Sequence, residues 1–133
     1  MRRQPESRFE ERHRRGRAAE ALAREHLIAS GYSILQANVR YPVGEIDLVA
    51  MEGVVLCFVE IRSASLLDFG GAAASVTRQK QKKIIQAARW FLKSCRIKFS
   101  EIRFDVVAIQ WNKPPKQASL ELIRAAFDCS GIS

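Results

Sequence analysis

The first strong pattern in the chain is a helical one that begins at Gly16. Apolar or weakly polar residues recur there at spacings of three, four and seven, which places them on one face of a helix; they are Ala19, Leu22, Ala23, His26 and Leu27. Gly31 comes shortly after them, and glycine is the usual residue just beyond a helix end. The sequence therefore predicts a helix from residue 16 to about residue 30.

Three strands are predicted after this helix. Residues 32–40 form the first, and the proline and glycine that follow them close it. Residues 45–50 alternate between two faces, and residues 54–62 are almost all apolar until their end, as in a strand that is covered on both sides. Residues 51–53 have a suitable length for the loop of a hairpin between these two strands.

A second helix and two more strands complete the predicted fold. Thr77 is a suitable cap for a helix over residues 78–95, whose apolar face comprises Ile84, Ile85, Ala88, Phe91 and Leu92. Residues 102–111 and 120–123 read as strands. The predicted order is α-β-β-β-α-β-β, which indicates one α/β domain.

The predicted domain spans residues 16–128. A basic, flexible arm precedes it at residues 1–15, a short tail follows at residues 129–133, and residues 63–75 form a flexible stretch rich in Gly and Ala. The length of 133 residues fits one domain of ordinary size.

Composition indicates a folded, cytoplasmic protein. Apolar residues make up 47% of the chain, and no apolar run has the roughly 20 residues that a membrane span needs. The basic N-terminus has no apolar stretch behind it, so it does not resemble a secretory signal. The three Cys residues are far apart and without CxxC spacing, and the chain has two His, so a zinc site is not expected.

The net charge of +8 favours binding to a polyanion, and much of it comes from the second helix. Eight cations and no acidic residue lie between positions 78 and 98: Arg78, Lys80, Lys82, Lys83, Arg89, Lys93, Arg96 and Lys98. Such a run forgoes the usual ion pairs along a helix and predicts contact with nucleic-acid phosphates. A solvated face of an amphipathic helix is the alternative. Trp90, beside Arg89, is the aromatic residue best placed to stack on a base.

Three polar residues stand where a covered strand should have none. Asp47 interrupts the apolar run EIDLVA, and Glu60 and Arg62 end the run VVLCFVEIR. Glu60 and Arg62 share a strand face because they are two residues apart. With a loop at residues 51–53, the strand partner of Asp47 is expected near residue 57, so bending of the strands must bring Asp47 to Glu60.

Two converging carboxylates suit a divalent ion that prefers oxygen ligands. Mg²⁺ or Mn²⁺ is therefore the expected cofactor, weakly held, and Arg62 would hold a phosphate beside it. Such sites hydrolyse phosphodiesters. The same pattern also fits a buried ion pair of Asp47 or Glu60 with Arg62 that only fixes the strand register.

The motifs resemble those of the YraN-like family of small uncharacterised bacterial proteins. The resemblance covers roughly residues 16–128 and is carried by GEIDLVA, then FVEIR, then the basic helix QKQKKIIQAARWFL and RFDVVAI. That family is similar to the PD-(D/E)xK nucleases, in layout to the archaeal Holliday-junction resolvases. The resemblance implies a restriction-endonuclease-like fold, with a mixed central sheet flanked by helices.

The resemblance also implies site residues. Asp47 and Glu60 would be metal ligands, the Ile61 carbonyl a third ligand, and Glu20 on the first helix an assisting carboxylate. Glu45 is a further strand carboxylate that could join them or remain a peripheral charge. Arg62 stands where the family pattern has Lys. Arg binds phosphate but is bulkier and stays protonated, which puts catalysis in doubt while leaving metal and nucleic-acid binding open.

The leading hypothesis is a metal-dependent endonuclease, or a protein derived from one, that acts on DNA such as branched or repair intermediates. The alternative is a catalytically impaired nucleic-acid-binding module of the same fold. A third hypothesis is an adaptor whose basic face binds an acidic protein. No membrane partner is expected, and a homodimer is compatible with the sequence.

Overall fold

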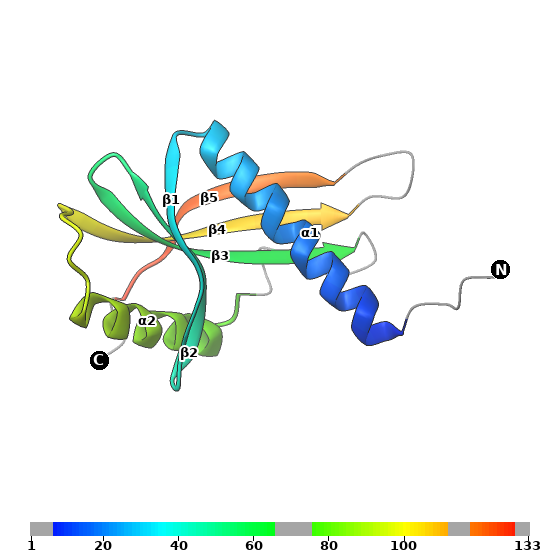
Figure 1. The fold of residues 1–133 in the computed structure, drawn as a ribbon, viewed down its shortest axis with the longest axis horizontal. Helices are drawn as coiled ribbons and strands as arrows, with labels where there is room; N and C mark the ends of the chain where they lie inside the picture. Colours follow the sequence, from blue (N-terminus) through cyan, green and yellow to red (C-terminus); the bar gives the residue numbers. More distant parts are fainter. Residues whose placement is uncertain (1–6, 66–75, 112–117, 130–133) are drawn as a thin grey trace.

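The computed structural model contains two helices and five strands within the residues it describes, which are 7–65, 76–111 and 118–129, with the backbone alone at 8–15 and 65 (Figure 1). In chain order the elements are α1 (Arg8–Ala29), β1 (Tyr32–Tyr41), β2 (Gly44–Glu52), β3 (Val55–Ser65), α2 (Arg78–Lys93), β4 (Glu101–Trp111) and β5 (Ser119–Phe127).

The five strands form one mixed sheet in the order β1-β2-β3-β4-β5. β3 and β4 are parallel, whereas the other neighbouring pairs are antiparallel. A parallel pair needs a crossover connection, and α2 lies in the segment that provides it. This architecture confirms the predicted α/β class and the order α-β-β-β-α-β-β.

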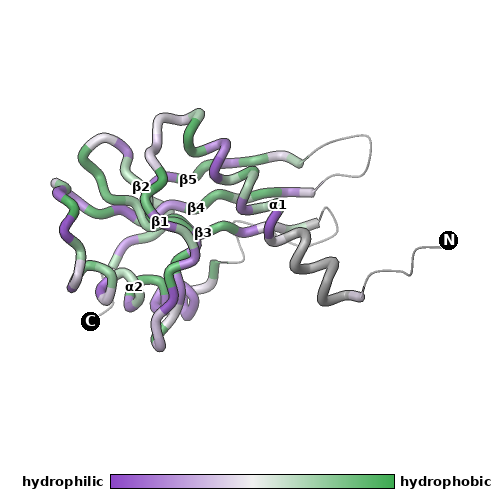
Figure 2. Tube along the Cα trace, viewed as in Figure 1, coloured by the Kyte–Doolittle hydropathy of each residue, from purple (hydrophilic) through white to green (hydrophobic). Residues whose placement is uncertain are grey.

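Each helix covers one face of the sheet. On one face α1 packs through Ala19, Ala23 and Leu27, against a cluster that includes Cys57 and Val59 of β3. On the other face α2 packs through its apolar side, against a cluster that includes Leu56 and Phe58, which alternate with Cys57 and Val59 along β3. Figure 2 shows the hydrophobic positions gathered along the central strands. The continuous apolar run of β3 is thus explained by cover on both faces.

Several element ends differ from the predicted ones. α1 begins at Arg8 rather than at Gly16, so the segment expected to be a flexible arm is helical from Arg8. A single Gly costs a helix only about 1 kcal/mol and does not stop it. β5 continues to Phe127 rather than ending near residue 123, because it keeps pairing with β4 beyond an irregularity. Residues 1–6, 66–75 and 130–133 of the expected arm, flexible stretch and tail lie outside the described residues.

α2 agrees closely with its prediction. Thr77 caps its first turn, since its side-chain oxygen accepts a hydrogen bond of 3.2 Å from the Lys80 amide. The helix ends at Lys93 rather than at residue 95, with Ser94 as the terminal cap. The cap fixes where the helix starts and therefore which of its cations lie beside the sheet.

The loop between β2 and β3 is shorter than predicted and lies later in the chain. Glu52 pairs with Val55, so the loop consists of Gly53 and Val54 rather than residues 51–53. Gly53 has a φ of +60°, which an amino acid with a side chain rarely adopts. This shift in the loop changes the register of the whole hairpin.

Candidate functional site

Asp47 and Glu60 lie opposite each other where β2 and β3 separate. The register runs from Glu52 with Val55 to Leu48 with Val59, and one further step places Asp47 opposite Glu60. The expected partner near residue 57 was wrong, because Cys57 pairs with Ala50. Consequently no bending of the strands is needed to bring the two carboxylates together.

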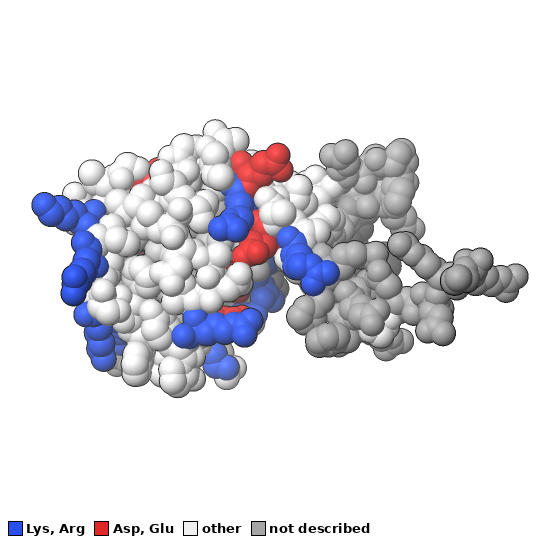
Figure 3. Space-filling view, viewed as in Figure 1, with Lys and Arg blue, Asp and Glu red and all other residues white. Residues whose placement is uncertain are grey.

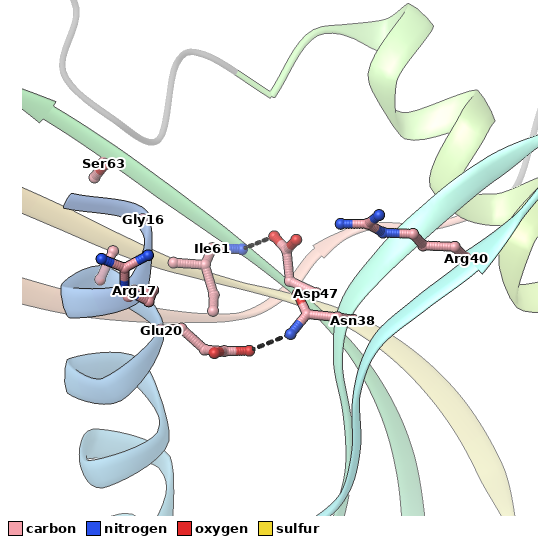
Figure 4. Close-up of a pocket in the computed structure, with 9 residues that line it drawn as sticks. Gly16, Arg17, Glu20, Asn38, Arg40, Asp47, Ile61 and Ser63 are labelled. Carbon is pink, nitrogen blue, oxygen red and sulfur yellow. Dashed lines mark hydrogen bonds between the residues drawn. The ribbon is translucent and has the colours of Figure 1, made fainter. Parts of the chain in front are cut away.

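Where β2 and β3 separate, the side chain of Asp47 accepts a hydrogen bond from the backbone of β3. Its Oδ2 accepts the backbone N–H of Ile61 at 2.8 Å, after the regular pairs of β2 with β3 have ended at Leu48 and Val59 (Figure 4). The carboxylate is thereby fixed in the fork between the two strands.

β1 is irregular at the same level of the sheet. Ala37 pairs with Leu48 and Val39 with Ile46, so Asn38 lies across from Asp47, outside the regular pairs. Asn38 has a φ of +53°, a left-handed conformation that non-glycine residues adopt mostly at turns and functional sites. Its side-chain amide donates a hydrogen bond of 2.8 Å to Oε1 of Glu20 on α1. Sequence reasoning missed Asn38, because neither its backbone conformation nor this partner has a local signal.

Asp47, Asn38 and Glu20 line one cavity, which we call the α1-side cavity. Its volume is about 330 Å³, and its other lining residues are Gly16, Arg17, Ala19, Arg40, Ile61 and Ser63. Figure 4 shows Glu20 on α1 held toward Asn38, with Asp47 above them beside Ile61. The structure thus brings the predicted Glu20 to the same cavity as Asp47.

Glu60 belongs to a second cavity on the other face, which we call the α2-side cavity. It measures about 490 Å³ and is lined by Glu60 together with Arg40, Tyr41, Pro42, Val43, Gly44, Glu45, Lys80, Lys83 and Ile84. Glu60 is only 6% exposed, and its Oε1 lies 3.7 Å from Nη1 of Arg62 and 4.0 Å from Nζ of Lys80. The carboxylate pair therefore stands between two cavities on opposite faces of the sheet.

Burial raises the pKa values of both carboxyl groups, and the charge of a neighbouring carboxylate adds to it, Glu45 for Asp47 and Asp47 for Glu60. Burial is the largest cause for Asp47, and the hydrogen bond from Ile61 offsets part of it. Burial, followed by the charge of Asp47 and a hydrogen bond with it, raises the pKa of Glu60 to about 8, although Lys80 and Arg62 act in the opposite direction. Two neighbouring carboxyl groups with raised pKa values, one buried and one half-buried, share a proton near neutral pH.

A bound cation would offset the repulsion between the two carboxylates in place of the shared proton. Two carboxylates and a backbone carbonyl fit Mg²⁺ or Mn²⁺, which commonly take one or two protein carboxylates and keep several waters. Within the described residues no group of three or more His, Cys, Asp or Glu side chains is arranged to hold a metal. The donor set therefore fits a weakly held hard ion and not a closed structural site.

The basic side chains of α2 divide into two groups. Lys80 and Lys83 line the α2-side cavity, whereas Arg78, Lys82 and Arg89 are exposed and do not line either cavity. Figure 3 shows basic side chains beside a small acidic zone near the middle of the view and along its left edge. Of the α2 cations predicted to contact phosphates, two thus line a cavity at the site and the others lie farther from it.

Glu45 is the most exposed of the candidate carboxylates. Its Oε2 lies 3.4 Å from Nε of Arg40, and both side chains are more than half exposed. Its charge contributes to raising the pKa of Asp47. Its exposure and its pairing with Arg40 agree with the peripheral role.

A second buried carboxylate, Asp105 on β4, was missed by sequence reasoning. Its signal was the same as that of Asp47, an acidic residue inside the apolar run RFDVVAI. Asp105 is fully buried and accepts hydrogen bonds from the Tyr32 hydroxyl (2.7 Å), from Nε and Nη2 of Arg103 (2.8 and 2.9 Å) and from the Ala125 amide (3.0 Å).

The partners of Asp105 give it a structural role. Burial alone would raise its pKa, but the hydrogen bonds from Arg103, Tyr32 and Ala125 together hold that pKa below its usual value. Arg103 and Arg124 also pair with Glu52, at 2.7 and 2.6 Å, which ties β4 and β5 to the β2–β3 hairpin. These four charges compensate one another at 2.6–2.8 Å, whereas the cations nearest to Glu60 are 3.7 and 4.0 Å away.

Comparisons with known proteins identify relatives across most of the chain. Over 120 residues it is 40% identical to a UPF0102 protein of Desulfosudis oleivorans, covering 90% of this chain and 94% of the relative. It is 40% identical over 116 residues to one of Moorella thermoacetica (87% and 97% covered) and 46% identical over 99 residues to one of Prosthecochloris aestuarii (73% and 76% covered).

A sequence model of the uncharacterised protein family UPF0102 matches residues 19–109, which include the carboxylate pair, Glu20 and all of α2. Neither described helix is long and apolar enough to cross a membrane. The match, the relatives and the YraN-like motifs agree, so this chain belongs to the UPF0102 family.

Proposed function

We propose that the protein is a metal-dependent endonuclease that acts on DNA. The observation that carries the proposal is the convergence of Asp47 and Glu60 at the fork of β2 and β3, between two cavities, with raised pKa values. Buried carboxylates with perturbed pKa values and no full set of partners are typical of functional sites. The resemblance of the motifs to PD-(D/E)xK nucleases supports the same reading.

Each side chain has a role in this proposal. Asp47 and Glu60 bind Mg²⁺ or Mn²⁺, with the Ile61 carbonyl as a third ligand. The ion supplies an activated water and stabilises the charge that develops on the phosphoryl oxygens. Arg62 and Lys80, both within 4.0 Å of Glu60, hold the phosphate on the α2 side.

Glu20 acts from the α1-side cavity. Its carboxylate is oriented by Asn38 and lines the same cavity as Asp47, so it can accept a proton from a water in that cavity.

The test is cleavage of branched and single-stranded DNA by the purified protein with Mn²⁺. Cleavage should disappear in Asp47→Asn and Glu60→Gln, which keep size and remove the charge. Glu121→Gln is the matched control, because Glu121 is an exposed carboxylate on β5 that lines neither cavity. Equal cleavage by Asp47→Asn and the control would overturn the proposal.

Arg62 favours a second candidate, a nucleic-acid-binding module without turnover. Its guanidinium lies 3.7 Å from Glu60, where a cation of fixed charge competes with a metal for that carboxylate. In this case DNA binding survives Asp47→Asn, and the wild-type protein does not cleave. Arg62→Lys decides between the two, since cleavage gained with this variant would show that Arg62 prevents turnover at an otherwise complete site.

A further inference from the structure

We infer that the α2-side cavity continues into a stacking site for an unpaired DNA base, formed by Trp90 and Tyr41. This inference rests on the proposed function and narrows its substrate class to DNA with a single-stranded segment beside the cleaved phosphate. The observations are the aromatic pair, its exposure and its position along α2.

Tyr41 and Trp90 form a stacked pair at the edge of the cavity. Their ring centroids are 5.9 Å apart, with an angle of 30° between the rings. Tyr41 lines the cavity together with Glu60, Lys80 and Lys83. The aromatic pair therefore lies next to the cations of the site.

Trp90 is 43% exposed, which is unusual for so large an apolar side chain. The buried face of α2 is made by its neighbours, which are Ile84, Ile85, Ala87, Ala88 and Phe91. The indole therefore lies beside the core, stacked with Tyr41, and its exposed part is covered only by the flexible side chain of Lys93 among the contacts of the described residues.

Cations flank Trp90 on both sides along the helix. Lys83 precedes it by seven residues, which is about two turns or 10 Å on the same side of the helix. Nζ of Lys93 lies 5.0 Å from the indole centroid. An aromatic platform between cations is the arrangement by which proteins bind single strands, because the cations contact phosphates and the ring stacks on a base.

Lys93 does not block the platform. A cation over an exposed ring is held more weakly than a stacked base, and the Lys side chain is long and flexible. A base that enters would displace the ammonium group, which could then pair with a neighbouring phosphate. A duplex gains nothing here, because its bases already stack on one another and offer only their edges in the grooves.

Trp90 can report on its own occupancy. The chain has two Trp residues, so Trp111→Phe leaves Trp90 as the only indole. Nε1 of Trp111 is buried and has no hydrogen-bond partner among the described residues, so this replacement removes no hydrogen bond seen there. Titration with a single-stranded oligonucleotide and with a blunt duplex of equal length, both without divalent metal, separates binding from cleavage.

Saturating single strand should quench the Trp90 emission, and the duplex should leave it unchanged, while the anisotropy of a labelled oligonucleotide records binding in each case. In the wild-type background Trp90→Ala should weaken single-strand binding roughly tenfold, and Trp90→Phe should retain most of it. Phe99→Ala is the matched control, because Phe99 is 39% exposed and lines neither cavity.

Unchanged emission at saturation, equal quenching by the duplex, or no binding of the single strand would each overturn the stacking site. Thermal unfolding of each variant shows that it is folded. None of these outcomes tests metal-dependent cleavage. That proposal is overturned separately, if cleavage is insensitive to Asp47→Asn.

Discussion

At the residue scale, Asp47 and Asp105 show how one sequence pattern leads to two different environments. Both interrupt apolar strand runs. Asp105 receives an Arg, a Tyr hydroxyl and a backbone amide, which keep its pKa low. Asp47 receives one backbone amide and faces a second acid, and the cations nearest to the pair lie 3.7 and 4.0 Å away, so its charge is only partly compensated. Compensation is therefore what separates a structural carboxylate from a candidate site.

The raised pKa of Glu60 predicts that metal binding depends on pH. The ion must displace the shared proton, so Mn²⁺ affinity should rise as pH increases toward about 8, and binding should release a proton. Calorimetry in buffers of different ionisation enthalpy measures that release. Glu60→Gln should bind Mn²⁺ more weakly and release less, whereas Glu121→Gln should match the wild type. Binding that does not change between pH 6 and pH 8 would contradict the shared proton.

The same group makes a prediction about stability. Because the pKa of Glu60 is higher in the folded state than its ordinary value of 4.5, its contribution is complete below that value and is lost as pH rises through about 8. Glu60→Gln should therefore be more stable than the wild type at pH 8–9, by several kcal/mol, since each pKa unit corresponds to about 1.4 kcal/mol. Urea unfolding at pH 5 and pH 9 measures the difference, and a gain equal at both pH values would contradict it.

Removing the charge of Asp105 should lower stability, whereas removing that of Glu60 should raise it. Asp105→Asn leaves Arg103 without its main partner and should lower the free energy of unfolding by about 3 kcal/mol. Urea unfolding at pH 7 is the measurement, with Glu121→Gln as control. Mn²⁺ affinity should stay at the wild-type level, since Asp105 lines neither cavity. A loss of stability below about 0.5 kcal/mol would show that the network is not needed for the fold.

At the element scale, the contact between the β1–β2 turn and α2 sets the α2-side cavity. Gly44 begins β2, and a Cβ added there would lie 2.8 Å from the backbone oxygen of Lys83. The hairpin therefore approaches the helix backbone so closely that only Gly fits. This contact fixes how far Lys80 and Lys83 stand from Glu60.

Gly44→Ala should push β2 and α2 apart and cost about 1–3 kcal/mol of stability. DNA affinity should fall with it, because Lys80 then moves relative to Glu60. Gly16→Ala is the control of opposite sign. Gly16 lies inside α1 with nothing within 4 Å of the added Cβ, so Ala should stabilise the helix by about 0.5–1 kcal/mol. Thermal unfolding measures both, and a neutral Gly44→Ala would show that the turn can move freely.

At the scale of the whole molecule, the charge of +8 is distributed unevenly with respect to the site. Lys80 and Lys83 line the α2-side cavity, while Lys82 and Arg89 face solvent away from it. A phosphate backbone held at the carboxylate pair would contact the first group. All of the positive charges would still contribute to the long-range attraction of DNA.

Salt dependence distinguishes contact from general attraction. Lys83→Gln should reduce the slope of log affinity against log salt by about one and weaken DNA binding. Lys82→Gln, one position away on the same helix, should change the slope much less. Fluorescence anisotropy between 50 and 200 mM salt measures both. Equal effects of the two substitutions would mean that DNA does not bind in the α2-side cavity.

The sequence alone determined the elements and the acidic pair. Hydrophobic spacing marks the helices and strands because the period of each element is a local property, and Asp47, Glu60 and Arg62 are conspicuous because carboxylates and guanidinium groups are costly to bury. The predicted register of the β2–β3 hairpin was wrong because the position and length of its loop were predicted wrongly. A two-residue turn at Gly53 and Val54 depends on one positive φ, and the shift it causes places Asp47 opposite Glu60.

Only the tertiary structure decided what surrounds the pair. Asn38 meets Glu20, Tyr32 meets Asp105 and Tyr41 meets Trp90, each across different elements. Neighbours of this kind depend on strand register and on how helices cross the sheet, which the packing of the whole core sets and no local pattern encodes. For the same reason the two cavities, and the division of the α2 cations between site and surface, became visible only in three dimensions.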